Sequence, residues 1–188
     1  MKEAQMPGLP DRRQIVVSGL FLLLAGFPAQ AQQGGPLIVA LGASNTEGRG
    51  RGRFNGGVNR GEAYPAQLEA MLRASGIRAS VRNAGIAGDT TGGMLARLDR
   101  AVPKGTKVVI LQPGGNDARR GIDEGAAAAN VAEIRRRLEA RGINVIMLEA
   151  LGRIGGRENR DPDGMHFNAA GHRAFAEWLL PQVQSALR

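Results

Sequence analysis

The stretch that decides the fold is LIVALGASNTEG, residues 37–48, in which an apolar run stops abruptly on small polar residues. The run from Leu37 to Leu41 is short and wholly apolar, which is typical of a strand buried on both faces of a sheet. Ser44 follows it within a wrapping of small residues. A hydroxyl directly after a buried strand is a candidate for chemistry, although a helix cap or an ordinary loop serine has the same local sequence.

Strand and helix patterns alternate along the rest of the chain. Apolar runs predict further strands, and spacings of three and four between apolar residues predict helices. Alternation of this kind predicts an α/β fold with a mainly parallel sheet covered on both faces. In the last helix we expect Phe175, Trp178, Leu179 and Val183 to face inward. The expected strands are 77–81, 107–111 and 143–148, and the expected helices are 64–75, 90–102, 122–141 and 168–187.

The first 31 residues have the features of a secretory signal peptide. Basic residues precede an apolar stretch at 15–27, and Pro28 and an Ala-x-Ala site ending at Ala31 follow it. The stretch is too short to span a bilayer comfortably, so no permanent membrane anchor is expected, although an uncleaved anchor is the rival interpretation. We therefore expect a domain at 32–188 that is exported and is periplasmic or secreted after cleavage.

Composition excludes several function classes. The 188 residues contain no cysteine and only two histidines, so disulfides, thiolate chemistry and an imidazole-rich metal site are not expected. The formal charge of +8 suggests a nucleic-acid-binding protein. However, aromatic residues, which could stack on bases, make up only 4% of the chain, and the arginines are spread along it. We expect no nucleic-acid partner, and the charge indicates a solvated arginine-rich surface that can also attract anionic substrates or membrane surfaces mildly.

Chemically useful side chains follow the predicted strands. The carboxyl ends of parallel strands meet at one edge, where α/β proteins bind ligands. There Ser44 would supply a nucleophile, His166 its general base, and Asp163, three residues earlier, the carboxylate that orients the imidazole. The backbone amides of Ser44 and Gly88 and the side chain of Asn116 would supply oxyanion donors. Each element alone is common in turns, and their joint occurrence at strand ends carries the prediction.

Four blocks of this sequence resemble those of the SGNH (GDSL) hydrolase superfamily: LGASNTEG, NAGIAGDTTGGMLARL, LQPGGND and DGMHFNAAGH. The similarity covers roughly residues 36–183 and is greatest to small bacterial esterases of the thioesterase, lysophospholipase and arylesterase type. The resemblance implies a flavodoxin-like three-layer α/β/α fold with four to five strands. It also implies Ser44 as nucleophile, the Asp163–His166 pair, and Gly88 and Asn116 in the oxyanion hole, with no metal or organic cofactor.

Two departures from the family pattern stand out. The aspartate that usually precedes the serine is Ala43, which puts the rigidity of that turn in doubt. Only residues 149–160 separate the last predicted strand from Asp161, so the pocket wall beside His166 is expected to be thin or open.

Other polar residues have less specific interpretations. We expect a structural or exposed role for His172, and we hypothesise that residues 48–61 form a mobile flap over the site. Arginines at 49, 51, 53, 60, 119 and 120 would either bind an anionic or sugar substrate or lie in solvated loops.

The sequence therefore predicts an exported serine esterase that cleaves small-molecule carboxylic esters or thioesters, such as acyl esters, lysophospholipids or acetylated sugars. Two alternatives stay open. One is a carbohydrate O-acetylesterase on the same fold, and the other is a catalytically silent binding module.

Overall fold

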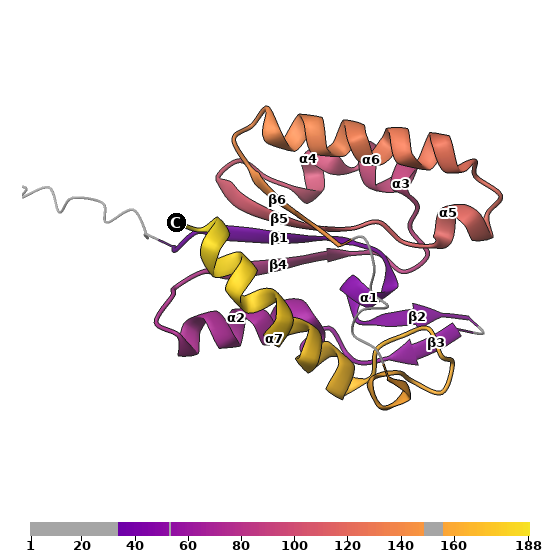
Figure 1. Cartoon of the computed structure of the whole chain (residues 1–188), viewed down its shortest axis with the longest axis horizontal. Coiled ribbons are helices and arrows are strands. Elements are labelled where there is room, and N and C mark those ends of the chain that lie inside the picture. Colours follow the sequence, from indigo (N-terminus) through magenta and orange to yellow (C-terminus); the bar gives the residue numbers. More distant parts are fainter. Residues whose placement is uncertain (1–33, 53, 149–155) are drawn as a thin grey trace, which may run out of the picture. The chain divides into compact units, whose positions relative to one another are not determined.

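The computed structural model describes residues 34–52, 54–148 and 156–188, which form a parallel sheet between two layers of helices (Figure 1). The four strands of the sheet lie in the order β4-β1-β5-β6. Numbered in chain order, this is 2-1-3-4, the order of the flavodoxin-like sheet without its last strand. The predicted fold class is confirmed, and the described residues form four of the four to five strands that were expected. The strands are β1 (Leu37–Gly42), β4 (Ser80–Gly85), β5 (Thr106–Gln112) and β6 (Asn144–Met147).

The two central strands divide the core into two halves. In β1, Ile38 and Ala40 point to one face of the sheet, while Val39 and Leu41 point to the other, and all four are fully buried. This double burial explains why the sequence of β1 is a continuous apolar run rather than an alternating one.

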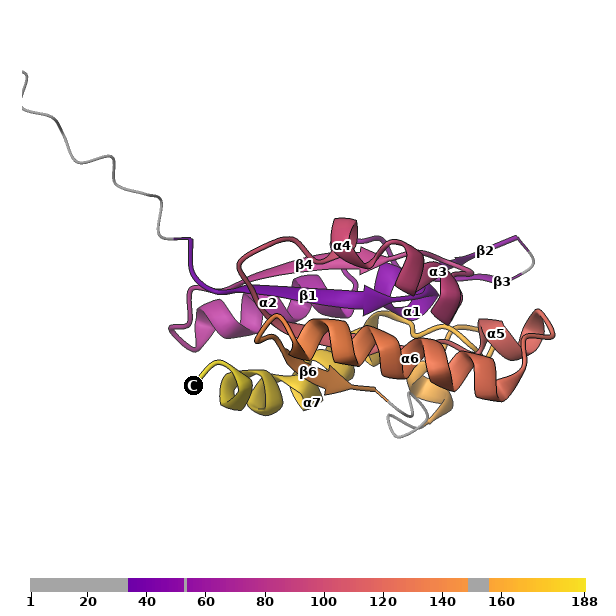
Figure 2. The same cartoon turned by 90° about the horizontal axis from the view of Figure 1, so that it is seen from above.

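Helices cover both faces of the sheet (Figures 1 and 2). Two long helices pack together over the Ile38 face, and three others cover the Val39 face. The first group is α2 (Tyr64–Ala74) and α7 (Ala169–Ala186), and the second is α3 (Thr91–Ala96), α4 (Leu98–Ala101) and α6 (Glu124–Glu139).

Two predicted elements differ from the observed ones. The expected helix at 90–102 is broken at Arg97, whose backbone leaves the helical region and whose side chain reaches back to the ends of β1 and β4. The expected strand at 77–81 is instead β4, at 80–85, and it includes Asn83 and Gly85. Such residues have little strand propensity, and pairing along the whole of β1 holds them extended.

The last helix faces the core largely as predicted. Phe175, Leu179 and Val183 are buried, but the prediction for Trp178 was wrong, because 43% of this residue is exposed. The Trp178 ring stacks on Phe175 with the centroids 5.8 Å apart, so it covers the edge of the core rather than entering it.

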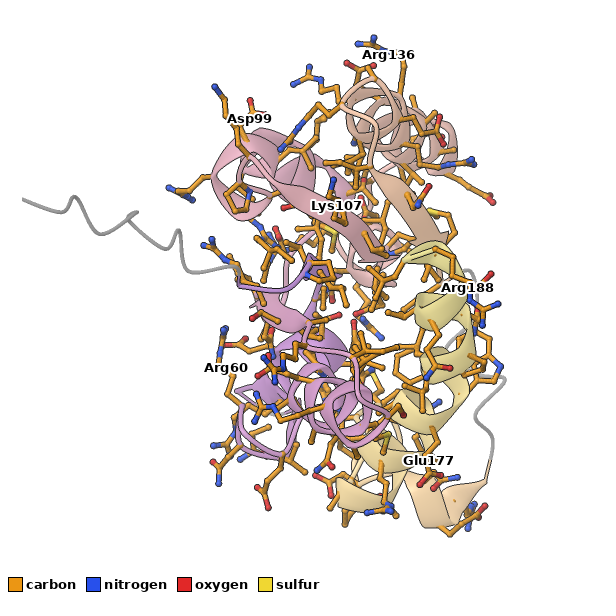
Figure 3. The ribbon with its side chains drawn as sticks, turned by 90° about the vertical axis from the view of Figure 1, so that its left-hand side faces the viewer. Arg60, Asp99, Lys107, Arg136, Glu177 and Arg188 are labelled. Atoms are coloured by element: carbon orange, nitrogen blue, oxygen red, sulfur yellow. The ribbon has the colours of Figure 1, made fainter. Side chains whose placement is uncertain are left out.

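Charged side chains lie mainly on the outside of the molecule (Figure 3). Arg136 on α6 and Arg173 on α7 pair with Glu133 and Glu177 one turn away along their own helices. Such exposed pairs agree with the solvated surface that the composition suggested.

A small antiparallel hairpin lies at the same end of the sheet as the carboxyl ends of the strands (Figure 2). It is formed by β2 (Arg49–Arg51) and β3 (Phe54–Gly57) and falls within the expected flap at 48–61. The backbone N–H groups of Gly56 and Gly57 donate to the carboxylates of Asp163 and Asp161, so the hairpin is tied to the loop that precedes α7.

The expected signal peptide at 1–31 and most of the short 149–160 segment lie outside the described residues. Within the described ranges, no helix is long and apolar enough to cross a membrane.

Candidate active site

A cavity of about 290 Å³ lies at the carboxyl ends of β1, β4 and β5. Its wall includes Ser44, Gly88, Asn116 and His166, four of the five residues that the sequence predicted to meet there. This is the crevice between the first and third strands in chain order, where the direction of strand addition reverses and α/β sheets bind ligands.

Ser44 is the first residue of α1 (Ser44–Glu47), a single turn that starts directly after β1. Ala43 precedes it, and the Ala43 carbonyl accepts hydrogen bonds from the N–H groups of Thr46 and Glu47. The close return of the chain requires glycine at position 42, since a Cβ there would lie 2.2 Å from Thr46 Oγ1. Ser44 is therefore held at the end of the sheet by the geometry of this turn.

Gln112, the last residue of β5, anchors the turn before Ser44. Its buried Oε1 accepts from the Ala43 N–H at 3.3 Å and from the Thr46 hydroxyl at 2.9 Å. Thr46 Oγ1 also lies 3.2 Å from the hydroxyl of buried Tyr64. The turn thus has a polar anchor from the neighbouring strand, although Ala43 itself has no side chain that could provide one.

Asp163 and His166 form a close pair in the loop before α7. Their Oδ2 and Nδ1 atoms are 2.6 Å apart, and both side chains are largely buried. Burial alone would raise the pKa of Asp163, but hydrogen bonds from the His166 ring and from the N–H groups of His166 and Met165 outweigh it and lower this pKa to about 2. The carboxylate is therefore ionised at any working pH and can hold the imidazole in one orientation.

Asn45 fixes the backbone on both sides of His166. Its Nδ2 donates to the carbonyl of Met165 at 3.3 Å, and its Oδ1 accepts from the N–H of Phe167 at 2.9 Å. These bonds join the residue after Ser44 to the loop that carries the histidine, across more than a hundred residues of sequence. The sequence contains no local signal for this contact, and Asn45 was not among the predicted site residues.

Gly88 and Asn116 line the same cavity as Ser44. Gly88 has φ +80°, a conformation that favours glycine. Asn116 begins α5 (Asn116–Arg119), and its Nδ2 donates to the carbonyl of Asp89 at 2.8 Å. Its Oδ1 accepts from Arg119 at 3.0 Å, so both ends of the amide are oriented and the second N–H of Nδ2 is left for a ligand.

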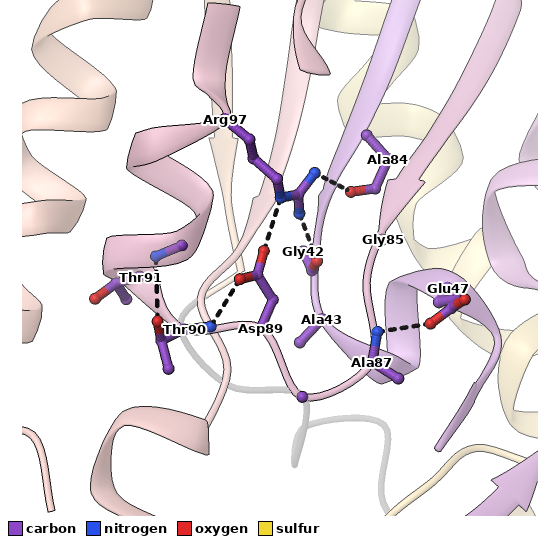
Figure 4. Close-up of polar contacts among 12 residues, drawn as sticks. Gly42, Ala43, Glu47, Ala84, Gly85, Ala87, Asp89, Thr90, Thr91 and Arg97 are labelled. Carbon is purple, nitrogen blue, oxygen red and sulfur yellow. Dashed lines mark hydrogen bonds and ion pairs between the residues drawn. The ribbon is translucent and has the colours of Figure 1, made fainter. Parts of the chain in front are cut away.

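A largely buried ion pair between Arg97 and Asp89 supports the Gly88 loop (Figure 4). Arg97 donates through Nε to Asp89 at 2.7 Å, and its other two nitrogens donate to the carbonyls of Ala84 and Gly42. One guanidinium thus joins the ends of two strands to the residue after Gly88. Neither Arg97 nor Asp89 was among the predicted site residues.

The second histidine, His172, is fully buried in α7. Its Nδ1 accepts from the backbone N–H of Tyr64, and its Nε2 lies 3.3 Å from the Gly48 carbonyl. It therefore connects α7 to α2 and to the start of the hairpin, so of the two expected roles, structural or exposed, the structure shows the structural one.

Ser44 and His166 line the same cavity. Among the residues that the structure describes, no hydrogen bond joins their two side chains. Catalytic hydrogen bonds often form only in the substrate complex. In the described ranges, no cluster of three or more His, Cys, Asp or Glu side chains is arranged to bind a metal ion.

The chain is similar in sequence to known ester hydrolases. Residues 40–159 match the GDSL-like lipase/acylhydrolase family. The chain is 32% identical over 93 residues to Esterase TesA of Pseudomonas aeruginosa, and 32% identical over 89 residues to an arylesterase of Vibrio mimicus. The matched segments cover 49% and 47% of this chain but only 46% and 44% of those relatives, less than half of their length.

Solved structures show the same fold. A crystal structure of TesA superposes with a TM-score of 0.70 at 21% identity and covers 80% of this chain and 99% of that one. The structure of AlinE4, an SGNH-hydrolase family esterase, superposes with a TM-score of 0.52 at 28% identity and covers 81% of this chain and 72% of that one.

Proposed function

The chain belongs to the GDSL-like lipase/acylhydrolase family, and from this premise we propose that it is a serine esterase that hydrolyses carboxylic esters or thioesters through an acyl-enzyme. The observation that carries the proposal is the pairing of Asp163 with His166 on the cavity that Ser44 also lines. A nucleophile, a base and an ionised carboxylate that orients the base are the minimum set for this chemistry.

In the proposed first step, the Ser44 hydroxyl attacks the ester carbonyl while His166 Nε2 takes its proton. Asp163 holds the proton on Nδ1 and stabilises the imidazolium that forms. The C–O or C–S bond to the leaving group then breaks, and His166 returns the proton to the departing alcohol or thiol. Water repeats the attack on the acyl-enzyme, with the same ring acting first as base and then as acid.

The backbone N–H groups of Ser44 and Gly88 and the free N–H of Asn116 stabilise the tetrahedral oxyanion in this proposal. Their support is that all three residues line the cavity, and that Asn116 is oriented by hydrogen bonds at both ends of its amide. Donors fixed in advance are worth more than mobile ones, because they need not reorganise as charge develops.

The proposal is tested by labelling with a fluorophosphonate probe and by ester hydrolysis. Wild type should label and hydrolyse p-nitrophenyl acetate, and Ser44→Ala should lose labelling and several orders of magnitude in turnover. Ser185→Ala, at an exposed position near the end of α7, is the matched control and should behave like wild type. Absence of labelling in folded wild type would favour a silent binding module.

Export also belongs to the proposal. Residues 1–31 are proposed to direct secretion and to be removed after Ala31. N-terminal sequencing of protein recovered from outside the cytoplasm should start at Gln32, and recovery of the full chain from the cytoplasm alone would contradict export.

A further inference from the structure

The wall of the proposed active site is poor in apolar side chains. Among the described residues that line the cavity, only Ala43, Ala87 and Met165 are apolar beyond glycine, and none is a branched aliphatic or aromatic residue. Burial of each CH₂ of an acyl chain is worth about four-fold in binding, but only where apolar surface covers it. Such a wall favours a short acyl group.

Positive charge lies beside two of the proposed oxyanion donors. Arg119 lines the cavity, and it donates to Asn116 Oδ1 at 3.0 Å and contacts the Met165 sulfur at 2.9 Å. Arg120 donates to the carbonyl of Gly88 at 2.8 Å. The acceptors of both guanidinium groups are neutral, and both side chains are exposed to solvent.

Two other arginines near the site differ from Arg119 and Arg120. Arg97 and Arg60 are paired with the carboxylates of Asp89 and Glu47. In the described part of the chain, neither Arg119 nor Arg120 has a carboxylate within ion-pair distance, and no acidic residue lines the cavity. The positive charge at this rim is therefore available to a ligand.

We propose that the enzyme selects small esters that carry a negatively charged group, and that Arg119 and Arg120 bind this group. The inference rests on the proposed esterase function. A guanidinium that already donates two hydrogen bonds retains further N–H donors, and its planar fork matches a carboxylate. Contacts to Asn116 and Gly88 hold both guanidinium groups beside two of the proposed oxyanion donors, where they can distinguish an anionic ester from its neutral analogue.

The test compares two pairs of esters. The first is 3-acetoxybenzoate against methyl 3-acetoxybenzoate, with the charge on the alcohol side. The second is monophenyl adipate against methyl phenyl adipate, with the charge on the acyl side. The measured quantity is the ratio of kcat/KM for the anionic ester to that for the neutral one, in wild type, Arg119→Gln, Arg120→Gln and the distant control Arg135→Gln.

We expect the ratio to fall about ten-fold or more in Arg119→Gln, less in Arg120→Gln, and not at all in Arg135→Gln, for at least one pair. That pair identifies the side of the ester that bears the charge. Added salt should reduce the wild-type ratio, because these groups are exposed. A loss of activity common to both esters cancels in the ratio, so a disturbed Asn116 does not imitate the effect.

Equal ratios in wild type and all variants would overturn the inference and leave the esterase proposal intact. Faster hydrolysis of neutral octanoate esters than of acetate esters would also overturn the inference and leave the esterase proposal intact. Failure of wild type to hydrolyse any of the esters or to react with the fluorophosphonate probe would overturn both.

Discussion

Asn45 holds the backbone on both sides of His166, through a donated bond to the Met165 carbonyl and an accepted bond from the Phe167 N–H. The residue next to the proposed nucleophile therefore helps to position the proposed base. This contact joins two loops that the sequence separates by 120 residues.

We expect Asn45→Ala to lower kcat by ten- to hundred-fold with little change in KM, because a shift of the histidine loop by a fraction of an ångström misaligns proton transfer. Asn45→Asp keeps the acceptor for the Phe167 N–H and loses the donor to the Met165 carbonyl, so its kcat should lie between those of wild type and Asn45→Ala. Asn144→Ala, which removes a side-chain contact at the far end of the sheet, is the control. A rise in KM alone would assign Asn45 to substrate binding instead.

Asn116→Ala should lower kcat roughly a hundred-fold, the usual worth of one oxyanion donor. Steady-state kinetics on a p-nitrophenyl ester separate this effect from binding. If KM rises while kcat holds, Asn116 binds substrate and does not stabilise the transition state.

Arg97→Met should destabilise the fold by about 3 kcal/mol, because it removes the ion-pair partner of the largely buried Asp89 carboxylate and one hydrogen bond from each of two strand-end carbonyls. Arg97→Lys should also be destabilising, since one ammonium cannot reproduce the fork. Urea unfolding measures both variants. Arg173→Met, which breaks an exposed pair with Glu177, should change stability by less than about 1 kcal/mol, and equal losses at the two sites would contradict the argument.

His172 should make the fold sensitive to mild acid. Burial lowers its pKa from 6.5 to about 4, and this effect outweighs the opposing hydrogen bond to Gly48. Below pH 6.5 the unfolded chain binds a proton that the native chain does not, so stability present above pH 6.5 is lost as the pH falls toward 4, by about 3 kcal/mol.

In His172→Gln the part of the acid-induced loss of stability that comes from His172 should disappear. Urea unfolding at pH 7 and pH 4 should show a smaller difference for the variant than for wild type, whatever its stability at pH 7. Identical differences in the two proteins would show that other groups cause the acid sensitivity.

Much of the fold was predictable from local patterns. The central strands are apolar runs because both of their faces are buried, and the long helices show apolar residues at helical spacing because one face of each is buried. The errors arose where the tertiary context overrides propensity, as in β4, which extends through Asn83 and Gly85 because it pairs with β1. Trp178 lies at the border of the apolar stripe of α7, where periodicity alone does not determine burial.

The sequence by itself determined the parallel α/β architecture and the set of small polar residues at the strand ends, because these depend on periodicity and on motifs within short segments. Only the tertiary structure decided that Gln112 supports the turn before Ser44, that Asn45 holds the His166 loop, and that Arg97 joins Asp89 to two strands. Each of these contacts links side chains to distant segments, and hydrogen bonds require a specific distance and angle that a linear pattern does not encode.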